Sequence, residues 1–399
     1  MPTFADLNHF IEMIEQEIRI EKIRREMQSE GADALLITSN VNLYYFTEQV
    51  VAGCLYIPID RDPVLFVRRP AVPESSREVN IRKPEQIIEI MAERNIPTAR
   101  RIMLEDGSMP YGERLRYEAI FRSAKIINGT PAIQRARSIK TQHELEQIRL
   151  SGRLHAEVYA KIPSLYRSGM TDLQLSVEIE REMRLARNLG MFRIFGQSME
   201  IFMGSVLAGD NAGAPSPYDF GLGGRGLHPS LPVGADNSKL LRGMSVMVDL
   251  GGNFTGYMTD MTRTYSIGKL SEKAYRAHQT ALEIQDEIAR TARPGAICED
   301  IYRKALETAE RNGLADCFMG RSQQARFVGH GVGIEVNELP VLGVRSRTEL
   351  APGMVLAVEP KFVIEGIGAV GIENTFAVTE TNAEKLTILN EEIVDLENR

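Results

Sequence analysis

Four carboxylates and one histidine stand out in the second half of the chain, because the acids occur in apolar stretches that read as strands. Aspartate and glutamate are poor strand residues, and an unpaired buried carboxylate is costly. Acids that lie close together stay ionised only if cations neutralise them. We therefore expect a metal site whose ligands are Asp249, Asp260, His330, Glu359 and Glu373.

An internal repeat connects these acids. Gly243–Asp249 resembles Gly353–Glu359, since each begins with Gly-Met, continues as a mostly apolar strand and ends on a carboxylate. A second acid follows in each copy, eleven residues later at Asp260 and fourteen residues later at Glu373. These spacings place each pair of acids across a turn. The repeat predicts a duplicated strand–turn–strand unit, and hence a domain with two pseudo-twofold halves.

The ligand types indicate the class of metal and the reaction. One imidazole with four carboxylates is a hard, oxygen-rich set, which suits manganese, cobalt, iron or zinc better than a thiolate-bound metal. His330 lies between glycines, where backbone can approach closely. Two ions roughly 3.5–4 Å apart can hold a hydroxide and polarise a carbonyl. We expect two divalent ions, manganese or cobalt by preference and zinc or iron as alternatives, and hydrolysis of an amide or a related bond.

The first part of the chain alternates short apolar runs with helical patterns, which is typical of an α/β domain. A capping box at Thr141–Glu144 then opens a long helix. We expect a domain boundary near residue 135, giving domains 1–135 and 136–399. Strands of the first domain are expected at residues 34–38, 55–59, 64–67, 101–104 and 125–127, with helices at 85–94 and 113–122.

The second domain mixes helices and strands in longer blocks, as in an α+β fold. After a helix capped at Thr171, residues 204–234 are rich in glycine and proline. We expect them to form one long loop that covers the cleft, since loops of this length are usually functional. A strand pair at 245–265, helices at 272–291 and 299–312, and a strand-rich end follow.

The overall composition excludes some classes of binding partner and indicates the cellular compartment. A formal net charge of −7 argues against a nucleic-acid or anionic-membrane partner. Three widely spaced cysteines indicate no disulfide framework, and no run approaches the ~18–20 apolar residues of a membrane span. We expect a cytoplasmic protein. Gly221–Gly226 matches a dinucleotide-binding glycine pattern, but no strand precedes it and Pro229 and Pro232 prevent the helix that should follow.

The motifs around the five ligands resemble those of the "pita-bread" metallopeptidases, which include aminopeptidase P, prolidase and methionine aminopeptidase. Residues 35–47 resemble the creatinase/prolidase amino-terminal domain, so the likeness covers nearly the whole chain. It implies an α/β amino-terminal domain followed by an α+β pita-bread catalytic domain. The catalytic motifs are Asp249–Gly252, Gly256–Thr264, Gly329–Gly333, Glu359–Pro360 and Ile372–Thr375.

The resemblance also implies a role for each ligand. Asp249 would chelate one ion, Asp260 and Glu373 would bridge both, and His330 and Glu359 would hold the second. Glu359 would in addition shuttle a proton as general base and then general acid. The implied substrate is a dipeptide or short peptide with proline second, and the implied assembly is a homodimer.

The chain departs from the family where substrate is recognised. Val233, Arg326 and Asn337 stand where the proline peptidases carry histidines, and Gly371 stands where they carry arginine. Arg326 could be a counter-charge or could bind a substrate carboxylate. Asn337 can donate to a tetrahedral intermediate but cannot shuttle protons. His228 is the nearest other imidazole. The catalytic candidates are therefore Glu359, His228, Asn337 and Arg326, and Tyr218, Asp219 and Phe220 are candidates for lining the pocket.

Three other interpretations stay open. The first is a non-peptidase hydrolase or lyase of a small amide or amidine, like creatinase or ectoine hydrolase; the replaced histidines favour it, while the complete ligand set counts against a metal-free version. The second is a peptide-binding module like those of histone chaperones, although such relatives lose the ligands. The third is a metal-bound protein with weak catalysis.

Overall fold

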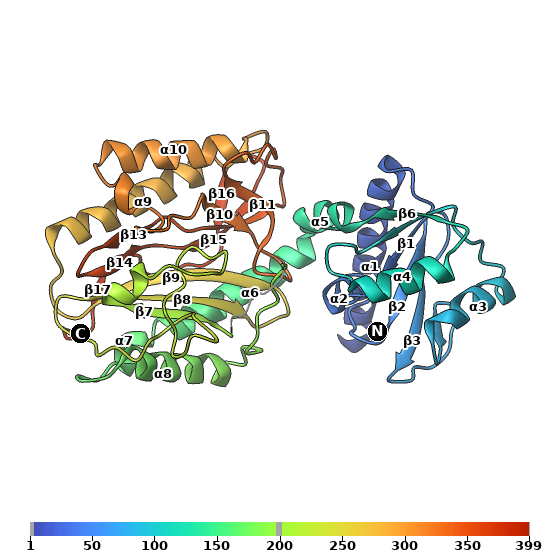
Figure 1. Ribbon diagram of the computed structural model, residues 1–399, viewed down its shortest axis with the longest axis horizontal. Coiled ribbons are helices and arrows are strands. Elements are labelled where there is room, and N and C mark those ends of the chain that lie inside the picture. The colour runs from blue at the N-terminus through green and yellow to red at the C-terminus, as the bar shows by residue number, and fades with distance from the viewer. Residues whose placement is uncertain (1–3, 197–201, 399) are drawn as a thin grey trace. The chain divides into compact units, whose positions relative to one another are not determined.

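The computed structural model describes residues 4–196 and 202–398, and the chain divides into two compact units (Figure 1). Unit 1 comprises Met1–Arg137 and unit 2 comprises Ser138–Arg399. The division falls at the end of helix α5 (Thr130–Ser138), compared with the predicted boundary near residue 135. In the described ranges, no helix is long and apolar enough to cross a membrane.

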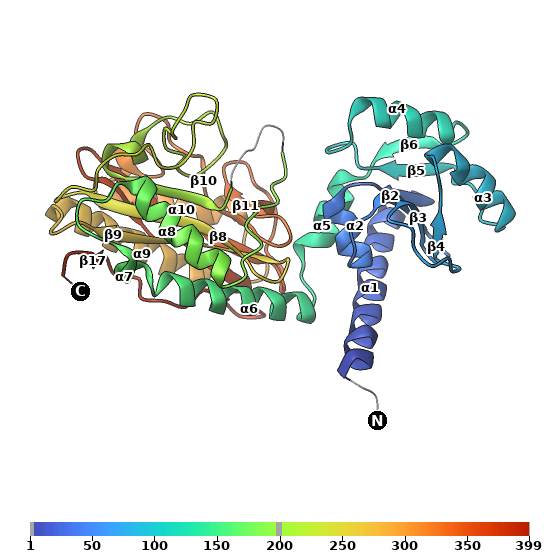
Figure 2. The same cartoon turned by 90° about the horizontal axis from the view of Figure 1, so that it is seen from below.

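Unit 1 is a mixed six-stranded sheet with helices on both faces, which confirms the predicted α/β domain (Figure 2). The strand order is β4-β3-β2-β1-β5-β6, and β1 pairs antiparallel with β2 but parallel with β5. The strands are β1 (Ala34–Ile37), β2 (Ala52–Pro58), β3 (Val64–Arg69), β4 (Glu78–Asn80), β5 (Arg101–Leu104) and β6 (Lys125–Asn128). The remaining helices are α1 (Phe4–Ser29), α2 (Asn40–Thr47), the short η1 (Pro84–Gln86), α3 (Ile87–Glu93) and α4 (Tyr111–Ile120).

The helices of unit 2 cover two sides of its strands. In Figure 1, α9 and α10 lie on one side, and α7 and α8 lie on the other. Thr141 and Thr171 both form the predicted capping boxes. The helices are α6 (Gln142–Tyr159), α7 (Ile162–Leu165), α8 (Asp172–Leu185), α9 (Glu272–Thr291), α10 (Cys298–Arg311) and the short η3 (Ala315–Cys317).

The strands described in unit 2 form three sheets. One has the order β17-β9-β8-β7, with β7 (Gly204–Ala208), β8 (Ser245–Asn253), β9 (Met258–Ser266) and β17 (Val394–Asp395). A second has the order β11-β10-β12-β15-β16, with β10 (Phe327–Gly331), β11 (Glu338–Gly343), β12 (Val355–Val358), β15 (Asn374–Val378) and β16 (Ala383–Lys385). The third is the hairpin of β13 (Lys361–Ile364) and β14 (Gly368–Gly371).

The predicted repeat corresponds to two antiparallel strand pairs, β8 with β9 and β12 with β15. The first pair is a simple hairpin, whereas the second contains the β13–β14 hairpin between its strands. The two pairs meet at Thr262 and Glu373, whose backbone N–H groups each donate to the other's carbonyl oxygen at 3.3 and 3.2 Å. This junction brings the acids of both repeats to one place.

The prediction of one continuous loop over residues 204–234 is wrong at its start. Residues 204–208 form strand β7, and residues 209–213 form the short helix η2 (Gly209–Gly213). Strand β7 pairs with β8 so that Ser205 lies opposite Asp249. The sequence hid this strand because its short apolar run lies between two glycines, and only its partner strand completes the hydrogen bonding.

Candidate active site

All five predicted ligands line one cavity of about 80 Å³ in unit 2. Asp249 and Asp260 project from the β8–β9 hairpin, and His330 projects from β10. Glu359 directly follows β12, and Glu373 directly precedes β15. The antiparallel pairing of the repeats therefore brings together acids that lie far apart in the chain, such as Asp249 and Glu359.

Asp260, His330 and Glu373 offer ligand atoms that lie within 4.8 Å of one another. His330 Nε2 is 3.9 Å from Asp260 Oδ2 and 3.5 Å from Glu359 Oε1. His330 Nδ1 lies 3.1 Å from the Gly331 carbonyl oxygen, to which a protonated Nδ1 donates. That tautomer directs the lone pair of Nε2 toward the acids, which is the usual way a metal-binding histidine is oriented.

Glu373 is the most buried acid of the group, with 1% of its surface exposed. Its Oε2 accepts from the Thr262 hydroxyl at 2.7 Å. Its Oε1 is buried and has no hydrogen-bond partner among the residues that the structure describes. Buried polar atoms without a partner are rare and need an explanation. A carboxylate that has an unsatisfied oxygen and is grouped with an imidazole and a second carboxylate fits a divalent cation.

The electrostatics of the cluster also favour a cation. Burial raises the pKa of Asp260 well above its ordinary value, and the charge of Asp249 raises it further. Burial and the charge of Asp260 likewise raise the pKa of Glu373. Both shifts express the cost of negative charge in this region, and a bound divalent ion would reverse them.

A lysine that was not predicted from the sequence lies inside the carboxylate cluster. The Lys361 ammonium is 2.8 Å from Asp249 Oδ2, 2.7 Å from Glu359 Oε2 and 3.0 Å from Glu373 Oε2. Only 1% of its side chain is exposed. Burial alone would lower the pKa of Lys361, but the three carboxylates raise it well above its ordinary value. The sequence does contain a signal that could have found Lys361: a charged residue begins an apolar strand directly after Glu359 and Pro360.

Gly371, where the resemblance led us to expect arginine, lies directly opposite Lys361 in the β13–β14 hairpin. Its φ is +152°, and a Cβ there would lie 2.5 Å from the Pro360 carbonyl oxygen and 2.8 Å from Lys361 Cα. A side chain at this position would therefore force the hairpin apart. The cation on this hairpin comes from Lys361.

A second, larger cavity of about 350 Å³ shares part of its wall with the first. Tyr218, Asp219 and Phe220, the candidates from the predicted loop, line it, and Asp219 and Phe220 also line the smaller cavity. Much of the wall around the ligands is apolar, with contributions from Phe192, Ile194, Phe220, Leu222, Phe327 and Val336.

The remaining catalytic candidates differ in where they lie. Asn337 lines the smaller cavity, but its side-chain amide is bound to the Phe195 backbone, donating at 2.7 Å and accepting at 2.8 Å. Arg326 is exposed and lines the larger cavity. His228 is exposed, lines neither cavity and accepts at Nδ1 from the backbone N–H of Ser230 at 3.1 Å.

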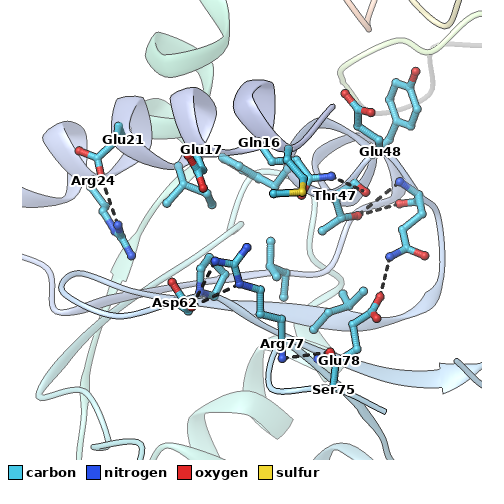
Figure 3. A pocket seen from close by; sticks show the side chains of 18 residues that line it. Gln16, Glu17, Glu21, Arg24, Thr47, Glu48, Asp62, Ser75, Arg77 and Glu78 are labelled. Atoms are coloured by element: carbon cyan, nitrogen blue, oxygen red, sulfur yellow. Dashed lines mark hydrogen bonds and ion pairs between the residues drawn. The ribbon is translucent and has the colours of Figure 1, made fainter. Parts of the chain in front are cut away.

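Unit 1 has a pocket of its own, of about 850 Å³, between α1 and the strands (Figure 3). Charged side chains line it but pair with one another, as Arg77 does with Asp62 at 3.2 Å and Arg24 with Glu21 at 3.1 Å. None of the five predicted ligands lines this pocket. The candidate active site is therefore the cavity in unit 2.

Comparison with known proteins identifies the family. Residues 146–380, more than half of the chain, match the model of metallopeptidase family M24. The chain belongs to metallopeptidase family M24. Residues 19–139 of this M24 chain match the creatinase/prolidase N-terminal domain, so the two matches correspond to the two units. The recognition made from the motifs is confirmed.

Individual relatives extend over almost the whole M24 chain. It is 27% identical to the peptidase YqhT of Bacillus subtilis, over 95% of this chain and 100% of that protein. It is 26% identical to the Xaa-Pro dipeptidase of Pyrococcus furiosus, over 94% and 99%. The solved prolidase of Pyrococcus horikoshii OT3 superposes with a TM-score of 0.75 at 22% identity, over 94% of this chain and 99% of that chain, which shows a shared fold.

Proposed function

We propose that this metallopeptidase is an aminopeptidase or dipeptidase that cleaves Xaa-Pro or similar short peptides. The observation that carries the proposal is the meeting of Asp260, His330 and Glu373 beside Glu359 in one cavity. The similarity to an Xaa-Pro dipeptidase over nearly the full chain supports the substrate class. A cytoplasmic location, expected from the composition, and a homodimer, implied by the family resemblance, complete the proposal.

Asp260, His330, Glu359 and Glu373 would hold divalent metal, with manganese or cobalt preferred. When bound, the metal lowers the pKa of a water molecule and polarises the scissile carbonyl. The protein holds the metal-ligand side chains in position. Thr262 holds one oxygen of Glu373, and the Gly331 carbonyl holds the ring of His330. The predicted number of two ions stays a prediction.

Glu359 is the residue we assign to proton transfer. Its Oε2 accepts from Lys361 at 2.7 Å, while its Oε1 lies 3.5 Å from His330 Nε2. The lysine bond fixes the carboxylate in the cavity, where Glu359 can take a proton from the attacking water and return it to the leaving amine. Glu359 is 3% exposed, so bulk water competes little for that proton.

The walls suggest how a short peptide is held. Phe220, Leu222 and Phe327 give the apolar surface that a proline ring or an aliphatic side chain needs. Arg326 in the adjoining larger cavity can bind the carboxylate of a dipeptide through a bidentate pair. Asn337 would act by holding the Phe195 backbone, because both of its amide groups are engaged there.

One observation favours the alternative, a hydrolase of a small amide or amidine. The cavity that contains the ligands has a volume of only about 80 Å³. A compact substrate would fit beside the ligands without use of the larger cavity.

The test is hydrolysis of Ala-Pro, Ala-Pro-Ala, Ala-Ala and small amides by protein supplied with manganese or cobalt. We expect metal-dependent cleavage of the proline peptides, and loss of it in Asp260→Asn and Glu373→Gln. Cleavage of small amides without cleavage of any peptide would favour the alternative. A protein that binds no metal under any of these conditions would overturn both.

A further inference from the structure

Lys361 divides the donor atoms of the cluster into two sets. Its ammonium binds one oxygen each of Asp249, Glu359 and Glu373, all within 3.0 Å. Three acceptors at these distances satisfy the three N–H donors of a lysine. On this side of the cluster, the Lys361 ammonium is therefore already the cation that these three oxygens bind.

The other set contains the donors that Lys361 does not use. Asp260, His330 and Glu373 form the cluster whose ligand atoms lie within 4.8 Å of one another, and both Asp249 and Glu359 are outside it. Lys361 leaves the second oxygens of the two glutamates unused: Glu359 Oε1 is 3.5 Å from His330 Nε2, and Glu373 Oε1 has no partner among the described residues. This set has the size and chemistry of a site for one ion.

The surroundings are shaped around the lysine. A Cβ on Gly371 would lie 3.2 Å from Lys361 Cγ, and a Cβ on Gly221 would lie 2.5 Å from Glu359 Oε2 and 3.6 Å from Lys361 Nζ. The backbone of strand β14 at Gly371 thus packs against Lys361. The backbone of the loop at Gly221 packs against Glu359, the acid that Lys361 binds. Tight packing of this kind holds the ammonium in place.

A second divalent ion would compete directly with Lys361. Such an ion would need Asp249, whose Oδ2 already accepts from the ammonium at 2.8 Å. A divalent ion bound to the same carboxylate would lie within a few ångströms of a buried positive charge. Like charges repel strongly at that distance where the surroundings are buried and screen little.

We propose that this centre binds a single divalent ion, held by Asp260, His330, Glu359 and Glu373, and that the Lys361 ammonium takes the place of a second ion beside Asp249. The inference rests on the proposed metallopeptidase function and replaces the two ions that the sequence led us to expect. Lys361 does not line the cavity, so it is a positioning residue that neutralises and orients three acids.

The experiment measures how many ions each chain binds and whether two bound ions are adjacent. The full chain is stripped of metal, loaded with excess Mn²⁺ and freed of unbound ion, and bound manganese is measured by mass spectrometry. Electron paramagnetic resonance then separates an isolated Mn²⁺ from a pair, because two adjacent ions couple magnetically. We expect one ion per wild-type chain, with the hyperfine-split spectrum of isolated Mn²⁺.

Variants test the role of the lysine. Lys361→Ala should bind two ions with a coupled spectrum, because Asp249 is released to bind metal. Adding Asp249→Asn to Lys361→Ala should return the count to one. Lys140→Ala is the matched control, because Lys140 is also a buried lysine and pairs with Glu338 at 3.0 Å outside the cluster. It should keep one ion.

Two coupled ions in the wild-type chain would overturn the inference and leave the peptidase proposal standing. A single ion in folded Lys361→Ala would equally refute the idea that the lysine excludes a second one. No bound ion in the wild type would overturn the metallopeptidase proposal itself. If Lys361→Ala does not fold, the wild-type count and spectrum still decide the number of ions.

Discussion

His155 gives unit 2 a pH-dependent stability that can be calculated from its surroundings. The side chain projects from α6, is fully buried, and lies with Nδ1 3.1 Å from the Thr259 hydroxyl. Its Nε2 has no hydrogen-bond partner among the described residues, and its ring packs edge-on against Tyr159 at 4.7 Å. Burial, helped by the positive charge of Arg263, lowers the pKa of His155 to about 3.

The sign of the effect follows from this lowered pKa. In the unfolded chain the imidazole takes up a proton near its ordinary pKa of about 6.5. The folded chain does not take up that proton until much lower pH, so the unfolded state binds more protons between these values. Stability is therefore complete above about pH 6.5 and falls as the pH drops. Between pH 7 and pH 5 the loss from this one group is about 2 kcal/mol, at 1.36 kcal/mol per pKa unit.

The perturbation is His155→Asn, which keeps a polar group near Nδ1 but does not titrate. Urea unfolding followed by far-UV circular dichroism at several pH values is suitable, because the chain contains no tryptophan to report by fluorescence. We expect the variant to be less stable at pH 7, since it loses ring packing. Between pH 7 and pH 5, the unfolding free energy of the wild type should fall by about 2 kcal/mol more than that of the variant.

The control is His143→Asn, a change to a partly exposed histidine on the same helix. It should retain the wild-type pH dependence. Parallel curves for wild type and His155→Asn would refute the reasoning, because they would mean that His155 titrates alike in the folded and unfolded chains.

Three further changes test individual contacts. Thr262→Val removes the hydroxyl that donates to Glu373 at 2.7 Å, and titration calorimetry should show metal affinity about 10-fold weaker. Arg326→Ala should raise KM for Ala-Pro about 10- to 100-fold but leave KM for Ala-Pro amide unchanged, because only the dipeptide offers a carboxylate. Arg321→Ala is the control for Arg326, since Arg321 lines the same cavity but pairs with Glu365 at 2.6 Å. Thr141→Ala removes the cap of α6 and should lower the unfolding free energy by about 1 kcal/mol in thermal or urea melts, without a change in pH dependence.

Much of the architecture could be predicted from the sequence because its signals are local. Helix α9 has the predicted bounds, residues 272–291, since the helical periodicity lies within the segment and a capping serine, Ser271, directly precedes it. The repeat predicted which acids share a site because pairing in a hairpin depends mainly on spacing. The structure brings all four acids and the imidazole to one cavity, and their ligation stays a prediction.

Features that depend on partners distant in sequence were decided by the tertiary structure. Strand β7 exists because β8 completes its hydrogen bonds, and Asn337 is engaged because folding brings the Phe195 backbone to it. Lys361 shows the same dependence most clearly. A lysine at a strand start usually points to solvent, and only the meeting of the two repeats surrounds this one with acids. Spacing along a chain determines which residues can be neighbours, whereas long-range packing determines which charges must share a buried volume.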